Sequence, residues 1–149
     1  MILDVFDNRI LIVSLAAWFL AQLIKVPVEY LRKKRWNWAL WFSTGGMPSS
    51  HSALVCGTAT AVGLYSGFNT PVFAIAMAVV MVVVYDAAGV RRQAGIHARR
   101  INMLIEELFT GQQISQDQLK EVLGHTPREV IVGVLFGISV TTILWFFWH

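Results

Sequence analysis

Charged residues are scarce in this chain of 149 residues: Asp, Glu, Lys and Arg make up only 14% of it, whereas 56% is hydrophobic. Its mean hydropathy is +0.58. A soluble domain of this length has too little interior to bury so much apolar surface. The composition therefore excludes an ordinary soluble domain and favours a protein whose solvent is largely lipid.

Cysteine is almost absent as well. The single Cys56 lies within an apolar stretch, so the chain has neither a disulfide framework nor a thiolate metal site. We interpret Cys56 as a small packing residue. A basic leader is also missing, because residues 1–7 are acidic, and no small-residue cleavage site follows the first apolar stretch. We therefore expect the first apolar stretch to be retained as a helix rather than removed as a signal peptide.

What the chain does have is four long apolar stretches. Each approaches the roughly 20 residues that an α-helix needs to cross a hydrocarbon core of about 30 Å. They predict an all-α, polytopic membrane bundle of about four transmembrane helices in a single membrane-embedded domain over residues 1–149. The second stretch is rich in Gly, Ala, Ser and Thr, which suit close helix packing, so we expect it inside the bundle. The four stretches are Ile10–Ile24, Ala53–Phe68, Val72–Val90 and Val130–Trp148.

The basic residues are concentrated in two linkers. Of the twelve Lys and Arg residues, five lie within residues 25–51 and six within residues 91–129, and only Arg9 lies elsewhere. With four spans these two linkers share one side of the membrane, which the positive-inside rule assigns to the cytoplasm. We therefore predict a multi-pass protein of the cell membrane with both termini outside.

The linker at residues 91–129 has helical patterns of its own. Ile101, Leu104, Ile105 and Leu108 recur at helical spacing beside charged residues. This pattern predicts an amphipathic helix on the membrane surface or over the functional site. A second short helix is expected over residues 115–124.

The segment Gly-Gly-Met-Pro-Ser-Ser-His-Ser at residues 45–52 is the first candidate for phosphate chemistry. Its glycines permit a tight turn, and either Ser49 or Ser50 can cap a helix whose free N–H groups bind a phosphate. His51 then lies in the first turn of that helix, where it can donate a proton to a bound phosphate ester. The alternative is an ordinary helix cap with an interfacial histidine.

The second candidate segment precedes the last apolar stretch. Thr126, Pro127 and Glu129 form a capping box, which is a sufficient structural reason for all three. The cap does not explain His125 or Arg128. A carboxylate four residues after a histidine can orient its imidazole and leave the other ring nitrogen free to attack phosphorus. Taken alone, this segment favours the cap-only interpretation.

Two further sets of charged residues lie near the ends of apolar stretches. Asp86 is costly at membrane depth unless it is paired or functional, and either Arg91 or Arg92 can pair with it while the other contacts a phosphate. Lys25 ends the first apolar stretch, and Arg32 would lie two helical turns further on the same face. The alternative is that these cations set the topology and contact anionic lipids.

Together these segments resemble the membrane-bound type 2 phosphatidic acid phosphatase and vanadium haloperoxidase superfamily, and more closely its divergent branch. The superfamily pattern has three parts: Lys, six residues and Arg-Pro; then Pro-Ser-Gly-His; then Ser-Arg, five residues, His, three residues and Asp. Here the second part is Pro-Ser-Ser-His at residues 48–51. Lys25 and Arg32 keep the spacing of the first part without its proline. His125 and Glu129 keep the end of the third, with its arginine about thirty residues upstream at Arg91 or Arg92.

The resemblance implies a lipid phosphatase that hydrolyses a phosphomonoester through a phosphohistidine, with no metal and no cofactor. His125 would attack phosphorus, Glu129 would orient it, and His51 would protonate the leaving alcohol. The lipid would be similar to phosphatidylglycerophosphate or phosphatidate, with an isoprenoid phosphate also possible. The implied partners are this lipid and the bilayer, and no nucleic acid. The alternative is a non-catalytic membrane protein of the same fold that binds anionic lipid or a partner protein. The phosphate would be held by Lys25, Arg32, Ser49, Ser50 and Arg91 or Arg92, with Asp86 and Arg128 as possible supporting residues.

Overall fold

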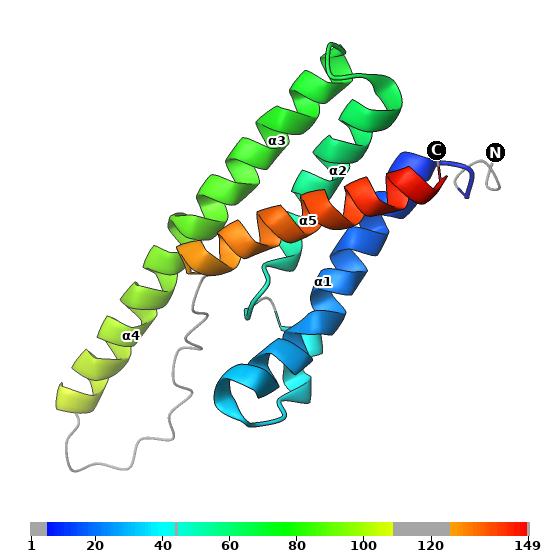
Figure 1. Ribbon diagram of the computed structural model, residues 1–149. Helices are drawn as coiled ribbons and strands as arrows, with labels where there is room; N and C mark the ends of the chain where they lie inside the picture. The colour runs from blue at the N-terminus through cyan, green and yellow to red at the C-terminus, as the bar shows by residue number, and fades with distance from the viewer. Residues whose placement is uncertain (1–5, 44, 109–125, 149) are drawn as a thin grey trace.

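The computed structural model describes residues 6–43, 45–108 and 126–148, with only the backbone of α4 at 90–92, 94, 99, 106 and 107 (Figure 1). The described part of the chain is helical and contains no strand. Its elements are α1 (Arg9–Lys33), the short 3₁₀ helix η2 (Trp38–Phe42), α2 (Ser50–Ser66), α3 (Pro71–Ala88), α4 (Val90–Leu108) and α5 (Pro127–Trp148).

Three of the described helices, α1, α3 and α5, are long and apolar enough to cross a membrane. This confirms the predicted all-α membrane bundle. The fourth predicted span differs: α2 has 17 residues, which is about 25 Å at 1.5 Å per residue. That length is less than the roughly 30 Å of a hydrocarbon core. Helix α2 packs against α1, α3 and α5, so much of its surface meets protein rather than lipid.

Small residues allow α2 and α5 to cross closely. A Cβ atom at Gly133 would lie 2.5 Å from the carbonyl oxygen of Ser49, and one at Gly137 would overlap the carbonyl oxygen of Ala53. One turn further along α5, the hydroxyl of Thr141 donates a hydrogen bond to the carbonyl oxygen of Gly57 at 3.3 Å. Contacts four residues apart on both helices define one continuous seam of small residues. The prediction that α2 lies inside the bundle is confirmed, and Cys56 is buried there.

Helix α1 is longer than its apolar stretch and continues past Lys25, so Arg32 lies on the same helix as the predicted two-turn spacing requires. The helix continues to Lys33 and includes Pro27. A proline has no N–H and leaves the carbonyl four residues earlier without its helical partner. Here the indole Nε1–H of Trp41 donates to that carbonyl, on Leu23, at 3.3 Å. The helix therefore continues past the proline, and the segment after it is tied back onto α1.

Two helix ends meet on one side of the bundle. The N–H of Ser49, at the start of α2, donates to the carbonyl oxygen of Glu129 in the first turn of α5 at 3.0 Å. The predicted capping box of α5 is confirmed, because Thr126 and Glu129 exchange hydrogen bonds at 2.8 and 3.4 Å. At the opposite end, Arg9 donates to the carbonyl oxygen of Trp148 at 3.0 Å, so the start of α1 lies beside the end of α5.

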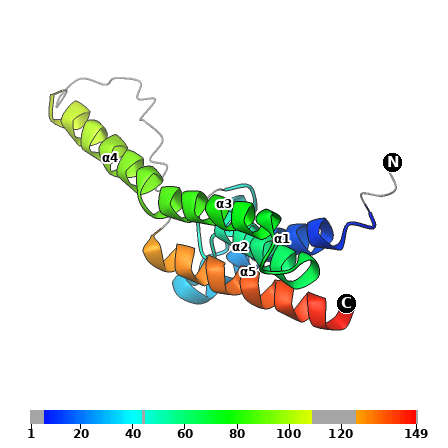
Figure 2. The same cartoon turned by 90° about the horizontal axis from the view of Figure 1, so that it is seen from above.

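Helix α4 begins directly after α3 and extends away from the bundle in both views (Figures 1 and 2). It contains the predicted pattern at Ile101, Leu104, Ile105 and Leu108, which confirms a helix there, and it begins earlier than expected, at Val90. Its position on a membrane surface stays a prediction. The second short helix, predicted over residues 115–124, lies outside the described residues.

Candidate active site

Lys25 is the buried charge of the described bundle. Its side chain is 1% exposed, although it belongs to one of the most strongly hydrated residue types. Its ammonium donates to the carbonyl oxygen of Ser43 at 3.1 Å and to the hydroxyl of Ser50 at 3.3 Å. The carboxylate of Glu129 attracts it electrostatically. Burying an ammonium is costly unless it is paired and hydrogen-bonded, so an anion bound beside Lys25 would be stabilised strongly.

The two serines at the start of α2 have different roles. Ser49 is the helix cap: its hydroxyl oxygen accepts from the N–H of Ser52 at 3.3 Å and from the Ser52 hydroxyl at 3.0 Å. Ser49 is fully buried, and its own N–H is bonded to Glu129. Ser50 is therefore the serine whose hydroxyl meets Lys25. Gly46, in the preceding loop, has φ +89, a conformation that favours glycine.

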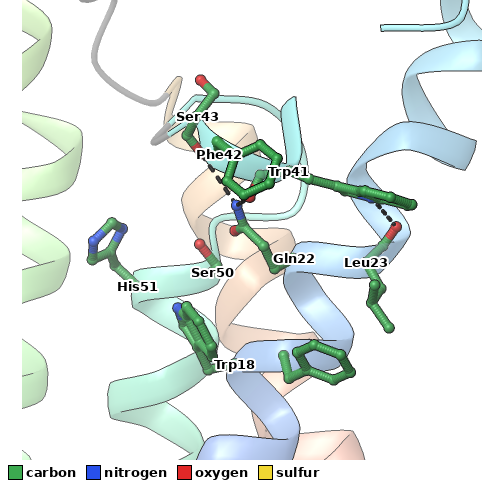
Figure 3. Close-up of a pocket in the computed structure, with 9 residues that line it drawn as sticks. Trp18, Gln22, Leu23, Trp41, Phe42, Ser43, Ser50 and His51 are labelled. Atoms are coloured by element: carbon green, nitrogen blue, oxygen red, sulfur yellow. Dashed lines mark hydrogen bonds between the residues drawn. The ribbon is translucent and has the colours of Figure 1, made fainter. Parts of the chain in front are cut away.

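A pocket of about 540 Å³ opens beside these groups. Its polar lining comes from Gln22, Ser43, Ser50 and His51. His51 is half-buried in the first turn of α2, next to Ser50 (Figure 3). The remaining lining is apolar and comes from Trp18, Phe19 and Leu23 of α1 and from Trp41 and Phe42. The pocket therefore joins an apolar region to the polar group around Lys25.

The segment over residues 38–43, which we term the strap, forms one wall of this pocket (Figure 3). The side-chain amide of Gln22 donates to the carbonyl oxygens of Trp41 at 2.6 Å, Leu40 at 3.3 Å and Ser43 at 3.4 Å. Sequence analysis did not identify Gln22 or Trp41 as site residues. A signal was present at Gln22, because an amide within an apolar span needs hydrogen-bond partners.

The structure brings some of the predicted site residues together. Lys25 and Ser50 are in contact, His51 adjoins Ser50, and the first turn of α5 with Glu129 is bonded to Ser49. Arg32 is exposed two turns beyond Lys25 on α1, and Arg128 is exposed at the start of α5.

The other predicted site residues lie on α3, on α4 or outside the described residues. Asp86 is half-buried in the last turn of α3. Arg91 and Arg92 belong to the first turn of α4, where the structure describes the backbone only. His125 lies outside the described residues. Within the described ranges, no three His, Cys, Asp or Glu residues are grouped so that they could hold a metal ion.

Comparison with known proteins places most of the chain in one family. Residues 6–140 match the family described as the Divergent PAP2 family. The chain is also 39% identical over 156 residues to a protein of Bacillus subtilis (strain 168) described as "Uncharacterized membrane protein YuiD", covering 97% of this chain and 99% of that relative. No solved structure matches the chain.

Proposed function

Because this chain belongs to the Divergent PAP2 family, we propose that it is a lipid phosphatase that hydrolyses a phosphomonoester at the cytoplasmic face of the membrane. One observation carries this proposal: the ammonium of Lys25 is buried against Ser50 at the polar end of an otherwise apolar pocket. A lipid phosphate has the same division of properties. Its phosphate requires a cation and N–H or O–H donors, and its hydrocarbon chains require an apolar surface.

The reaction divides into two displacements at phosphorus. In the first, a ring nitrogen of His125 attacks phosphorus, the bond from phosphorus to the lipid oxygen breaks, and His51 gives its proton to that oxygen. In the second, His51 takes a proton from water, whose oxygen displaces His125 and releases inorganic phosphate. Glu129 uses one carboxylate oxygen to accept the N–H of Thr126 at 2.8 Å. Its other oxygen orients His125 and stabilises the imidazolium.

The phosphate oxygens are held by groups from three helices. Lys25 of α1 has three N–H donors, of which two bond to Ser43 and Ser50 within the described part of the chain. The third is left for the phosphate. Ser50, the first residue of α2, contributes its hydroxyl and its N–H where charge develops in the transition state. Arg91 or Arg92, in the first turn of α4, completes the set. Arg32 and Arg128 are exposed, and we assign them to anionic lipid headgroups.

The phosphatase proposal is tested with purified protein in detergent micelles. Phosphatidylglycerophosphate, phosphatidate and an isoprenoid phosphate are each offered, and inorganic phosphate release is measured. We expect His51→Ala to lower the rate by about 100-fold or more, because a positioned proton donor contributes roughly 10²–10⁴-fold. His125→Ala should lower it at least as much, because it removes the nucleophile and with it the covalent route. The matched control is His97→Ala on the exposed side of α4, which should leave the rate unchanged.

Two results would contradict the phosphatase proposal. Unchanged rates in both His51→Ala and His125→Ala would exclude the phosphohistidine route. Binding of lipid phosphates by the wild-type protein without any release of phosphate would instead support the non-catalytic alternative.

Vanadate, which resembles the transition state of phosphoryl transfer, should inhibit the wild-type enzyme.

The proposed orientation has a separate test. In a Cys56→Ala background, one variant carries Lys34→Cys after α1 and another carries a cysteine added after His149. A membrane-impermeant maleimide applied to intact cells should label the added C-terminal cysteine, and should label position 34 only after the membrane is opened. Labelling of both positions from outside would refute the placement of the site at the cytoplasmic face.

A further inference from the structure

The pocket beside Lys25 has two regions of different chemistry along one face of α1. Trp18, Phe19, Gln22 and Leu23 all line it, and Lys25 lies just beyond them on the same helix. From Trp18 to Lys25 is seven residues, or about 10 Å along the helix axis. The pocket therefore runs from Ser50, which the buried ammonium of Lys25 contacts, towards the apolar middle of α1.

The apolar walls of this pocket belong to the outer surface of the bundle. Trp18, Phe19 and Leu23 are 38%, 54% and 37% exposed, and Phe42 of the strap is 94% exposed. In a chain that spans a bilayer, exposed apolar side chains on a spanning helix face lipid. The pocket is thus bounded by α1 and the strap, and it is open towards the hydrocarbon rather than only towards water.

The strap is held in place by bonds that fix the width of the pocket. Gln22 binds three of its carbonyl oxygens, and Trp41 is bonded to the carbonyl that Pro27 leaves free on Leu23. These bonds hold the apolar side chains of Trp41 and Phe42 across from those of α1. The same segment supplies the carbonyl of Ser43 to Lys25. The apolar walls and the cation are therefore parts of one built structure.

We propose that the apolar region of this pocket binds a hydrocarbon chain of the phosphorylated lipid, which enters sideways from the bilayer between α1 and the strap. This inference rests on the proposed function and names the part of the substrate that the enzyme uses to select it. The chain lies along Trp18, Phe19 and Leu23, and the phosphate lies at Lys25 and Ser50. Short, water-soluble phosphate esters lack the part that this region recognises, so they are poor substrates.

A second groove on the bundle shows that an apolar volume alone does not identify the binding site for the hydrocarbon chain. It has a volume of about 570 Å³ and is lined by residues of α1, α2 and α3, including Leu11, Leu15 and Val72. Its polar lining consists of Asn8, Ser14 and Thr58, and it contains no cation. The groove therefore lacks the positive charge that a phosphate requires. The pocket beside Lys25 differs from this groove because its apolar wall continues to Ser50, whose hydroxyl contacts the buried ammonium of Lys25.

The test uses a matched pair of leucines on α1. Leu23→Trp narrows the proposed chain site, whereas Leu15→Trp adds the same bulk to the second groove; the two leucines are 37% and 48% exposed. The catalytic efficiency kcat/KM is measured with dioleoyl phosphatidate in micelles and with soluble dibutyryl phosphatidate. Leu23→Trp should lower kcat/KM for the long-chain substrate about tenfold, since misfit of an apolar group in a pocket is worth roughly 10–200-fold. Its kcat/KM for the short-chain substrate, and both values for Leu15→Trp, should stay at wild-type levels.

A second measurement does not depend on turnover. Phosphatidate with a photoreactive diazirine near the end of one acyl chain is irradiated with the His51→Ala protein, and the labelled peptides are mapped. We expect label on residues 18–23 of α1 and on the strap. Excess dioleoyl phosphatidate should compete for this label, whereas diacylglycerol, which lacks the phosphate, should not.

The two measurements separate failure of this inference from failure of the proposed function. A wild-type protein that hydrolyses phosphatidate, but whose Leu23→Trp and Leu15→Trp variants behave alike and whose label is spread over α3, would overturn the chain site and leave the phosphatase intact. Specific labelling of residues 18–23 with no hydrolysis of any lipid phosphate would overturn the phosphatase and support the chain site.

Discussion

Replacing Lys25 with methionine should lower the rate of lipid phosphate hydrolysis by about 10²–10³-fold, the usual effect of removing one preorganised donor at a developing charge. The ammonium is the buried cation at Ser50, so its loss removes both the attraction for the phosphate and a hydrogen bond to it. Methionine is unbranched and apolar, so it can occupy the same buried space. The loss of the bonds to Ser43 and Ser50 costs about 1–3 kcal/mol for each buried group left without a partner, and removal of the buried charge offsets part of this cost. The melting temperature of Lys25→Met in detergent should therefore fall by several degrees, while the protein still folds.

The control for this variant is Lys33→Met on the same helix. Lys33 is exposed and forms an ion pair with Glu29 at 2.7 Å, a surface contact that contributes little to stability or chemistry. Initial rates of phosphate release and melting temperatures of the two variants are compared in one detergent. If Lys25→Met hydrolysed the lipid as fast as Lys33→Met does, Lys25 would not be the phosphate-binding cation. Its burial would then need another explanation.

Replacing Gly137 with leucine should destabilise the bundle by about 3 kcal/mol or more, at the upper end of the usual cost of overpacking. The first added carbon would overlap the backbone oxygen of Ala53 on α2. A backbone atom in a packed helix cannot move aside as the end of a flexible side chain can, so α5 must separate from α2. That separation would also disturb the bond between Ser49 and Glu129, which joins the two helix ends at the site.

The melting temperature of the purified protein is measured by heating samples and recording how much of the monodisperse size-exclusion peak remains at each temperature. A loss of about 3 kcal/mol corresponds to a decrease of roughly 6–12 °C for a chain of this length. Ser139→Leu adds comparable bulk two residues away on the same helix, at an exposed position, and should leave the melting temperature nearly unchanged. Equal melting temperatures for the two leucine variants would show that the α2–α5 seam tolerates separation.

Much of the helical arrangement could be predicted from local sequence patterns. Runs of apolar residues define α3, α5 and the start of α1 within a few residues, because a helix must satisfy its own backbone in lipid. The box formed by Thr126 and Glu129 also depends on neighbouring residues alone. The end of α1 could not be predicted in this way. Its continuation past Pro27 is accompanied by a bond from Trp41, which comes from a different part of the chain.

The candidate site shows the same division between local and distant causes. The segment Pro-Ser-Ser-His at residues 48–51 points to phosphate chemistry by residue type and spacing alone. It does not tell which serine caps α2, because both have the required hydroxyl. The choice is made by Lys25, whose ammonium contacts Ser50, and by the tight contact of Gly133 with Ser49. Gln22 became part of the site only through its bonds to the strap.

The amino-acid sequence alone is enough to predict a helical membrane protein with its basic residues in two linkers and with motifs that resemble those of a phosphatase family. These properties follow from composition, periodicity and spacing, each of which is local to the chain. The burial of Lys25 against Ser50 and the apolar pocket beside it are visible only in the folded chain. Burial and pocket shape arise from contacts between residues far apart in sequence. The local pattern of Lys25 is that of a lysine at the end of an apolar stretch, and it is the packing of α1 against α2 and the strap that makes this lysine a buried charge.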